Sequence, residues 1–121
     1  MTKHMNIYEE PISQNFIKLP NFLFEEPFFQ RLSSEAKLLY AIILRRAELS
    51  RKNNWADDDG RVFIYHPTVE TTEVLHCGRE KAMDTIRELT YVGLVDSKRQ
   101  GQGKPNKIYP KFYEPTENRE V

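Results

Sequence analysis

The fold is decided by residues 66–110, which read HPTVETTEVLHCGREKAMDTIRELTYVGLVDSKRQGQGKPNKIYP. The first part predicts a short helix that is capped by Thr68 and ends near Leu75. A break follows, and a second helix is expected from Arg79 to about Val92, where Gly93 ends it. Two helices joined by so short a break are typical of a helix-turn-helix unit.

The residues after this helix pair predict a hairpin. Two strands are expected, at roughly 94–99 and 106–112, joined by the glycine-rich segment 100–105. A further strand is expected at residues 62–65, after a turn at Asp59-Gly60. Helix, break, helix and hairpin in this order predict an α+β fold, a winged helix-turn-helix with a small antiparallel sheet and a β-hairpin wing.

The second helix is amphipathic. Ala82, Ile86 and Leu89 share one face by their spacing, and we expect that face to pack inward. The opposite face is then free to enter a DNA major groove, and Arg79 near the helix start can contact a guanine or a phosphate. The candidate DNA-reading residues are Gly78, Arg79, Glu80, Lys81, Met83, Asp84 and Arg87. The two acids either accept from cytosine amino groups or pair with Arg87 or Lys81 across helical turns.

The hairpin carries uncompensated positive charge. Residues 97–107 contain basic but no acidic side chains, although the whole chain has 18 Lys+Arg and 18 Asp+Glu. A phosphate backbone would compensate this charge, and the alternative is a solvated hairpin. Gly101 and Gly103 would allow close approach. The candidate wing contacts are Lys98, Arg99, Gln100, Gln102, Lys104, Asn106 and Lys107.

Composition describes one soluble domain of 121 residues, with 39% hydrophobic and 30% charged residues and no net charge. The single cysteine, Cys77, excludes an internal disulfide, and no apolar run is long enough to span a bilayer. His66, His76 and Cys77 lack metal-ligand spacing, and residues 57–59 are typical of a solvated turn. We therefore expect no metal, no cofactor and no catalysis.

The N-terminal part is rich in phenylalanine. Residues 1–14 predict a flexible arm, whereas residues 16–29, FIKLPNFLFEEPFF, contain two prolines that favour short helical turns. A long helix is expected over Leu32–Ser50, capped by Ser33 or Ser34. The aromatic rings either cover the core of the fold or form a dimer surface. The dimer-interface candidates are Phe16, Phe22, Phe24, Phe28 and Phe29.

Three segments together resemble the N-terminal domain of the RepA-type plasmid replication initiators of Gram-positive bacteria. They are KLLYAIILRR (37–46), SRKNNWADDDGRVFIYH (50–66) and GLVDSKRQGQGKPNKIYP (93–110). The resemblance covers roughly residues 16–113. One departure is Gly78, which stands where related helices often have a Ser or Thr cap.

The resemblance implies that residues 15–113 form a DNA-binding domain of an initiator that acts in the bacterial cytoplasm. Such initiators start plasmid replication by binding iterons, repeated sequences in the duplex DNA of the origin, and their N-terminal domain tends to form homodimers. Residues 79–87 would read the DNA, and residues 98–107 would be the wing. Residues 114–121 would begin a linker to a separate C-terminal domain that recruits host replication proteins. Neither a membrane nor a small-molecule substrate is implied.

Two other functions remain open. A transcriptional repressor would read duplex DNA with the same helix and wing. A protein-interaction module would use the wing to bind an acidic partner.

Overall fold

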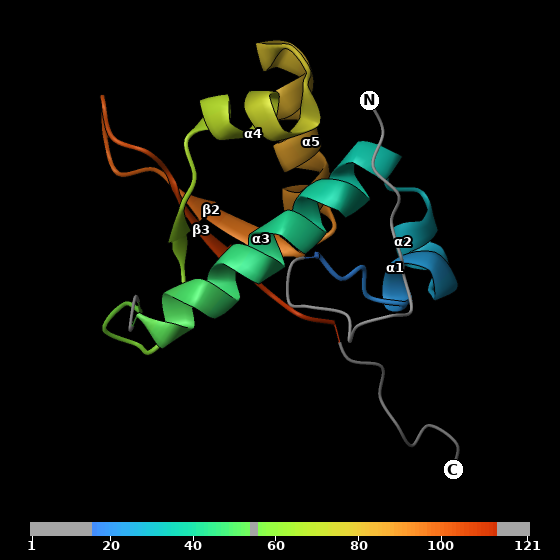
Figure 1. Cartoon of the computed structure of the whole chain (residues 1–121), viewed down its shortest axis with the longest axis horizontal. Coiled ribbons are helices and arrows are strands. Elements are labelled where there is room, and N and C mark those ends of the chain that lie inside the picture. The colour runs from blue at the N-terminus through green and yellow to red at the C-terminus, as the bar shows by residue number, and fades with distance from the viewer. Residues whose placement is uncertain (1–15, 54–55, 114–121) are drawn as a thin grey trace, which may run out of the picture.

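The computed structural model describes residues 16–53 and 56–113. The helices are α1 (Phe22–Glu25), α2 (Pro27–Gln30), α3 (Ser34–Lys52), α4 (Thr68–Leu75) and α5 (Arg79–Tyr91). The strands are β1 (Ile64–Tyr65), β2 (Val95–Lys98) and β3 (Lys107–Pro110). The expected arm (1–14) and linker (114–121) lie outside the described residues. The fold is a winged helix, as predicted, with α4, α5 and the β2–β3 hairpin at one end of the molecule (Figure 1).

The sheet is small and antiparallel, with the strand order β1-β3-β2. In the hairpin, Val95 pairs with Pro110 and Lys98 pairs with Lys107. The wing, residues 98–107, begins at this last strand pair and projects beyond the paired strands (Figure 1). Side chains alternate along each strand, and the central strand β3 buries side chains on both of its faces.

The central helix α3 packs against the sheet and the helix pair. Its buried residues Ala36, Leu39, Tyr40 and Ile43 follow the i, i+3, i+4, i+7 spacing of one helix face. Ser33 caps the helix, since its side chain accepts a hydrogen bond from the Ala36 amide. Residues 38–44 are all apolar, which predicts that the middle of α3 is buried on all sides. This prediction is wrong for Leu38, which projects from the opposite face and is 40% exposed.

Prolines break the aromatic segment into α1 and α2, as expected. Phe22 and Phe29 are buried, with ring centroids 5.4 Å apart, and Phe22 also contacts Tyr40 and Phe112. These two rings form part of the core, so the expectation that they belong to a dimer surface is corrected. The remaining candidates are exposed: Phe16, Phe24 and Phe28.

The helix-turn-helix pair differs from its prediction at one cap. The N-cap of α4 is Pro67, whose extended backbone precedes the helix, and Thr68 is the first helical residue. His76 has a left-handed backbone (φ 53°) that ends α4, and Gly78 is the N-cap of α5 without a side-chain cap. Gly93, with φ 82°, follows the end of α5 as predicted. No helix in the described part of the chain is long and apolar enough to cross a membrane.

Candidate nucleic-acid interface

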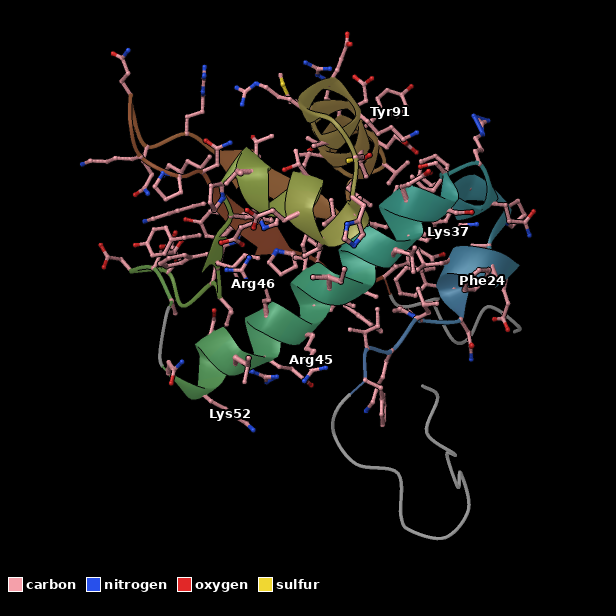
Figure 2. The ribbon with its side chains drawn as sticks, turned by 45° about the horizontal axis from the view of Figure 1, so that its top comes forward. Phe24, Lys37, Arg45, Arg46, Lys52 and Tyr91 are labelled. Carbon is pink, nitrogen blue, oxygen red and sulfur yellow. The ribbon has the colours of Figure 1, made fainter. Side chains whose placement is uncertain are left out.

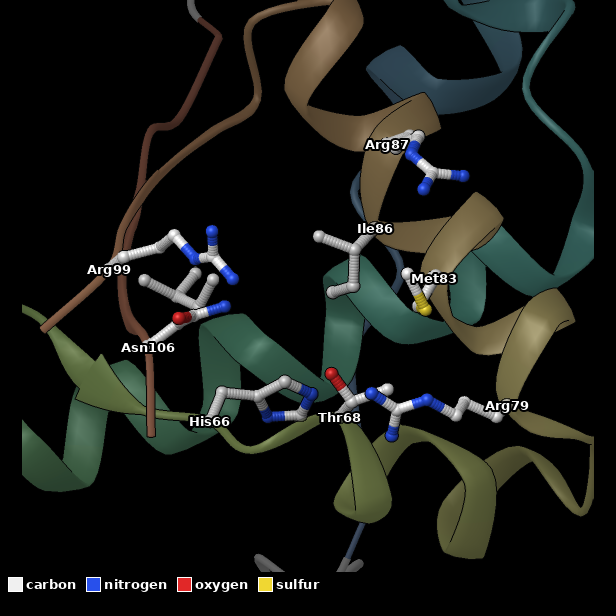
Figure 3. Close-up of a pocket in the computed structure, with 9 residues that line it drawn as sticks. His66, Thr68, Arg79, Met83, Ile86, Arg87, Arg99 and Asn106 are labelled. Carbon is white, nitrogen blue, oxygen red and sulfur yellow. The ribbon is translucent and has the colours of Figure 1, made fainter. Parts of the chain in front are cut away.

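A groove of about 240 Å³ lies between α5 and the wing (Figure 3). Arg79 and Arg87 of α5 line it together with Arg99 and Asn106 of the wing. The remaining lining residues come from α5, β3, the start of α4 and the segment before it: Met83, Ile86, Ile108, Thr68 and His66. The helix and the wing therefore project from a common side of the molecule and share one concave surface.

The alternation of strand residues divides the cations of the wing between two faces. Arg99 and Asn106 line the groove, as does Ile108 on the same side of the hairpin. Lys107, one residue before Ile108, extends to the other side, where its ammonium lies 4.5 Å from the ring centroid of Phe63. Lys98 pairs directly with Lys107 across the strands, so two like charges are neighbours there.

The wing tip is a glycine turn that closes on itself. Gly101 has φ 124° and Gly103 has φ 79°, which L side chains rarely adopt. The side-chain amide of Gln100 donates to the Pro105 carbonyl at 2.9 Å, so this predicted contact residue also holds the turn together. Gln102 and Lys104 are exposed at the tip, where they can reach a partner.

The base of the wing is joined to the helices through His66, which is only 3% exposed. Its backbone N–H donates to the Asn106 carbonyl at 3.0 Å. Its ring Nδ1 lies 3.0 Å from Nη1 of Arg46 on α3, and its Nε2 lies 2.6 Å from Oγ1 of Thr71 on α4. Arginine only donates, so Nδ1 accepts and the ring proton on Nε2 is donated to Thr71. His66 thereby connects α3, α4 and the wing.

Burial and the adjacent guanidinium of Arg46 lower the pKa of His66 to about 4. Glu70 would favour the charged ring, but its carboxylate is 3.6 Å from Nδ1 and is itself bound by Arg46. The imidazole is therefore neutral at neutral pH. Arg46 also donates to the Tyr65 carbonyl, whereas its neighbour Arg45 leaves α3 in another direction and donates to the Phe16 carbonyl (Figure 2).

The charged side chains of α5 face in different directions. Lys81 lies 3.8 Å from Glu35 of α3, so this predicted reading residue faces α3 and does not line the groove. Glu88 accepts hydrogen bonds from the backbone N–H and the hydroxyl of Ser33, each at 2.8 Å. These two contacts fix α5 against the start of α3.

Of the two acids predicted to pair with a neighbouring cation or to contact cytosine, Asp84 pairs with Arg87. Its Oδ1 accepts from Nη1 of Arg87 at 2.7 Å, in an exposed pair three residues apart. Glu80 is exposed and makes no ion pair with the described residues. The described residues also contain no group of three or more His, Cys, Asp or Glu side chains that could hold a metal ion.

Sequence reasoning missed the contribution of His66, Thr68, Ile86 and Ile108 to the groove. Ile86 and Ile108 have ordinary core positions in a helix and a strand, so their residue types carry no signal for a surface site. His66 stands before Pro67 and the start of α4, which is the one local sign that it lies near the helix pair.

Comparison with solved structures gives three similar chains with nearly equal scores. "Structure of Rep-DNA complex" has a TM-score of 0.74 and 33% identity, and the match covers 86% of this chain and 80% of that one. "N-Terminal domain of DNA binding protein" also has a TM-score of 0.74, with 30% identity over 97% of this chain and 88% of that one. "Structure of MDR initiator" has a TM-score of 0.73 and 34% identity, covering 87% and 83% of the two chains.

Comparison of sequences agrees with the structural matches. The "41 kDa protein" of Lactobacillus helveticus is 32% identical over an alignment of 110 residues, and the match covers 84% of this chain and 31% of that protein. The chain thus spans about a third of the length of this relative. The model of the family "Replication initiator protein A (RepA) N-terminus" matches residues 15–121. The chain therefore belongs to the family of replication initiator protein A N-terminal domains.

Proposed function

We propose that this domain binds duplex DNA at a plasmid origin, with α5 in the major groove and the wing along the adjacent backbone. One observation carries the proposal: a single groove brings Arg79 and Arg87 of α5 together with Arg99 of the wing. An α-helix fits the major groove, and arginine binds both phosphates and guanine edges. A similar structure, at 33% identity, is titled a Rep–DNA complex, which supports the same partner here.

The local charge supports a polyanionic partner although the chain is neutral overall. No acidic residue lies between Ser97 and Tyr113, and Lys98 and Lys107 lie directly opposite each other. Like charges in such a pair destabilise a hairpin in isolation, and phosphates on either side would relieve the repulsion. The wing residues Gln102 and Asn106 can add hydrogen bonds to the backbone. Gly78, the N-cap of α5, and Met83 within the helix would lie against the DNA together with Arg79.

The proposed biological role is replication initiation through iterons. Footprinting on origin DNA distinguishes this role from that of a repressor, because an initiator protects tandem repeats and a repressor protects one promoter palindrome. Recruitment of host replication proteins belongs to the proposal for the whole initiator, since the chain spans 31% of its longer relative.

The direct test is the salt dependence of duplex binding. Changing Arg99 and Lys104 to Ala should reduce the slope of log K against log salt by about 1.8, since each neutralised phosphate contributes about 0.9. The matched control changes Arg51 and Lys52 to Ala, because these two cations line a separate groove beside the start of the described chain. An unchanged slope and affinity in the wing variant would contradict the proposal and favour an acidic protein partner.

Arg79 tests base reading against backbone binding. Arg79→Ala should weaken a specific duplex by about 1–3 kcal/mol while changing random DNA much less. Equal losses on both duplexes would assign Arg79 to the phosphates.

Homodimerisation through the exposed rings of α1 and α2 is the second part of the proposal. Phe24 and Phe28 are 50% and 57% exposed, so both rings are accessible to a second copy of the chain. Sedimentation at micromolar concentration should show a dimer that Phe24→Ser and Phe28→Ser together dissociate. Leu49→Ser, at an equally exposed position near the end of α3, is the control. A monomeric wild-type domain would remove the idea of a preformed dimer.

A further inference from the structure

The exposed ion pair on α5 places an acid where DNA binding would disfavour it. Asp84 and Arg87 have exposed fractions of 60% and 65%, and Oδ1 is 2.7 Å from Nη1. A pair so exposed contributes little to fold stability. A carboxylate facing phosphates also weakens binding by repulsion. Neither folding nor general DNA affinity therefore explains why an acid occupies this position.

We propose that Asp84 is a positioning residue that orients the guanidinium of Arg87 to read a guanine. The inference rests on the proposed function and assigns part of its sequence specificity. Arginine has five N–H donors, and Asp84 takes one of them. The remaining donors are sufficient for the bidentate contact to O6 and N7 of guanine. Fixing the side chain before binding reduces the conformational entropy lost when the contact forms.

The surroundings of the pair support this assignment. Arg87 lines the groove shared with the wing, so its side chain lies at the proposed interface. The other charged contacts of α5 are made by Lys81 and Glu88 to the start of α3. They fix the position of the helix and do not orient a side chain toward the DNA. Arg79 and Arg87 are eight residues apart, or about 12 Å along the helix. That distance corresponds to about three to four base pairs, so the two arginines would read different positions.

Removing the acid separates the two explanations because they predict different effects on sequence preference. If Asp84 only repels DNA, Asp84→Ala should strengthen binding to every duplex and leave sequence preference unchanged. If Asp84 positions Arg87, the same variant should bind random DNA at least as well but lose preference for its own site. Loss of a rotamer restraint of this kind should lower the preference by about 2- to 12-fold.

The experiment starts from a duplex selected by the wild-type domain from a random pool. Each G·C pair of this duplex is replaced by A·T in turn, and the resulting loss of affinity is measured for the wild type and for Arg87→Ala. The position assigned to Arg87 is the one where the loss is largest in the wild type and is absent in Arg87→Ala. The discrimination ratio, which is the affinity for the G·C duplex divided by that for the A·T duplex at this position, is then measured. The proteins compared are the wild type, Asp84→Ala, Arg87→Ala and the double variant. The double variant should have the ratio of Arg87→Ala, because Asp84 acts only through Arg87.

Glu73→Ala is the matched control. Glu73 is an exposed acid on α4 that makes no ion pair with the described residues, so its loss changes the charge equally without freeing an arginine. It should leave the discrimination ratio unchanged, and circular dichroism should show that all variants are folded. An unchanged ratio in Asp84→Ala overturns the inference while DNA binding stands. A wild-type domain that selects no duplex overturns the proposed function and the inference together.

Discussion

The stability of the domain should fall between pH 7 and pH 4 because His66 is buried in its neutral form. The free imidazole has a pKa of 6.5, and in the folded chain burial and Arg46 lower the pKa of His66 to about 4. Below pH 6.5 the unfolded chain binds a proton that the folded chain does not, so acid favours unfolding. Above pH 6.5 the ring is neutral in both states and contributes no pH dependence. The loss approaches its full value as the pH falls through the folded pKa.

The size of the effect follows from the two pKa values. The difference between them corresponds to a stability loss of about 2 kcal/mol at pH 5 and about 3 kcal/mol at pH 4. A hydrogen bond from the backbone N–H of Arg61 lowers the pKa of Asp57, and one from the Arg61 side chain lowers the pKa of Asp96. Both aspartates therefore affect stability at a lower pH than His66 does. Their stabilisation is lost only as the pH falls through and below 3.8, the ordinary value for an aspartate. Between pH 7 and pH 4.5, the change in stability with pH therefore reports the protonation of His66.

Urea unfolding at a series of pH values measures this dependence. The midpoint should move to lower urea as the pH falls, with the slope of the transition unchanged. His66→Gln removes the titrating group and should flatten the curve between pH 7 and 4.5, although the variant is less stable overall. A wild-type stability that stays constant over this range would refute the assigned protonation state. So would a variant that keeps the full pH dependence.

Three further changes have expected effects on stability. Glu88→Ala should destabilise the domain by roughly 2 kcal/mol in chemical denaturation, because the Ser33 N–H loses its charged acceptor. Gly101→Ala should cost about 1–3 kcal/mol, since φ 124° is strained for an L side chain, and a cost near zero would mean that the tip relaxes. Lys98→Glu should raise the free energy of unfolding by about 0.2–1 kcal/mol by pairing with Lys107, while duplex binding weakens. A stabilised variant with unchanged binding would contradict the wing's role.

The order of elements could be predicted because its signals are local. Pro20 precedes α1, Pro27 begins α2, Gly93 follows α5, and the glycine-rich segment marks the turn of the hairpin. The winged-helix order of elements also predicts that α5 and the wing lie on one side of the molecule, and the groove confirms it, although Arg79 and Arg99 are far apart in the sequence. Signals of this kind depend on neighbouring residues and need no knowledge of packing.

What could not be predicted depends on contacts between distant elements. α1 and α2 are too short for a periodic pattern, so nothing in the sequence distinguishes the buried Phe22 and Phe29 from the exposed Phe24 and Phe28. The hydrogen bond between His66 and Arg46 joins residues on different elements, and the neutral state of the ring follows from burial and from the charge of Arg46.

The placement of Lys81 shows why helical spacing alone does not define a DNA-facing surface. Spacing puts Lys81 beside the reading residues, but the start of α3 approaches that side of α5 and supplies Glu35 as its partner. One flank of α5 therefore anchors the helix through Lys81 and Glu88, and another places Arg87, which is paired with Asp84, at the groove. Changes on the anchoring flank should alter stability first and DNA binding only through the fold. Changes on the groove flank should alter DNA binding at constant stability. Because the two flanks share one short helix, measuring both quantities for each variant is what separates a reading residue from a supporting one.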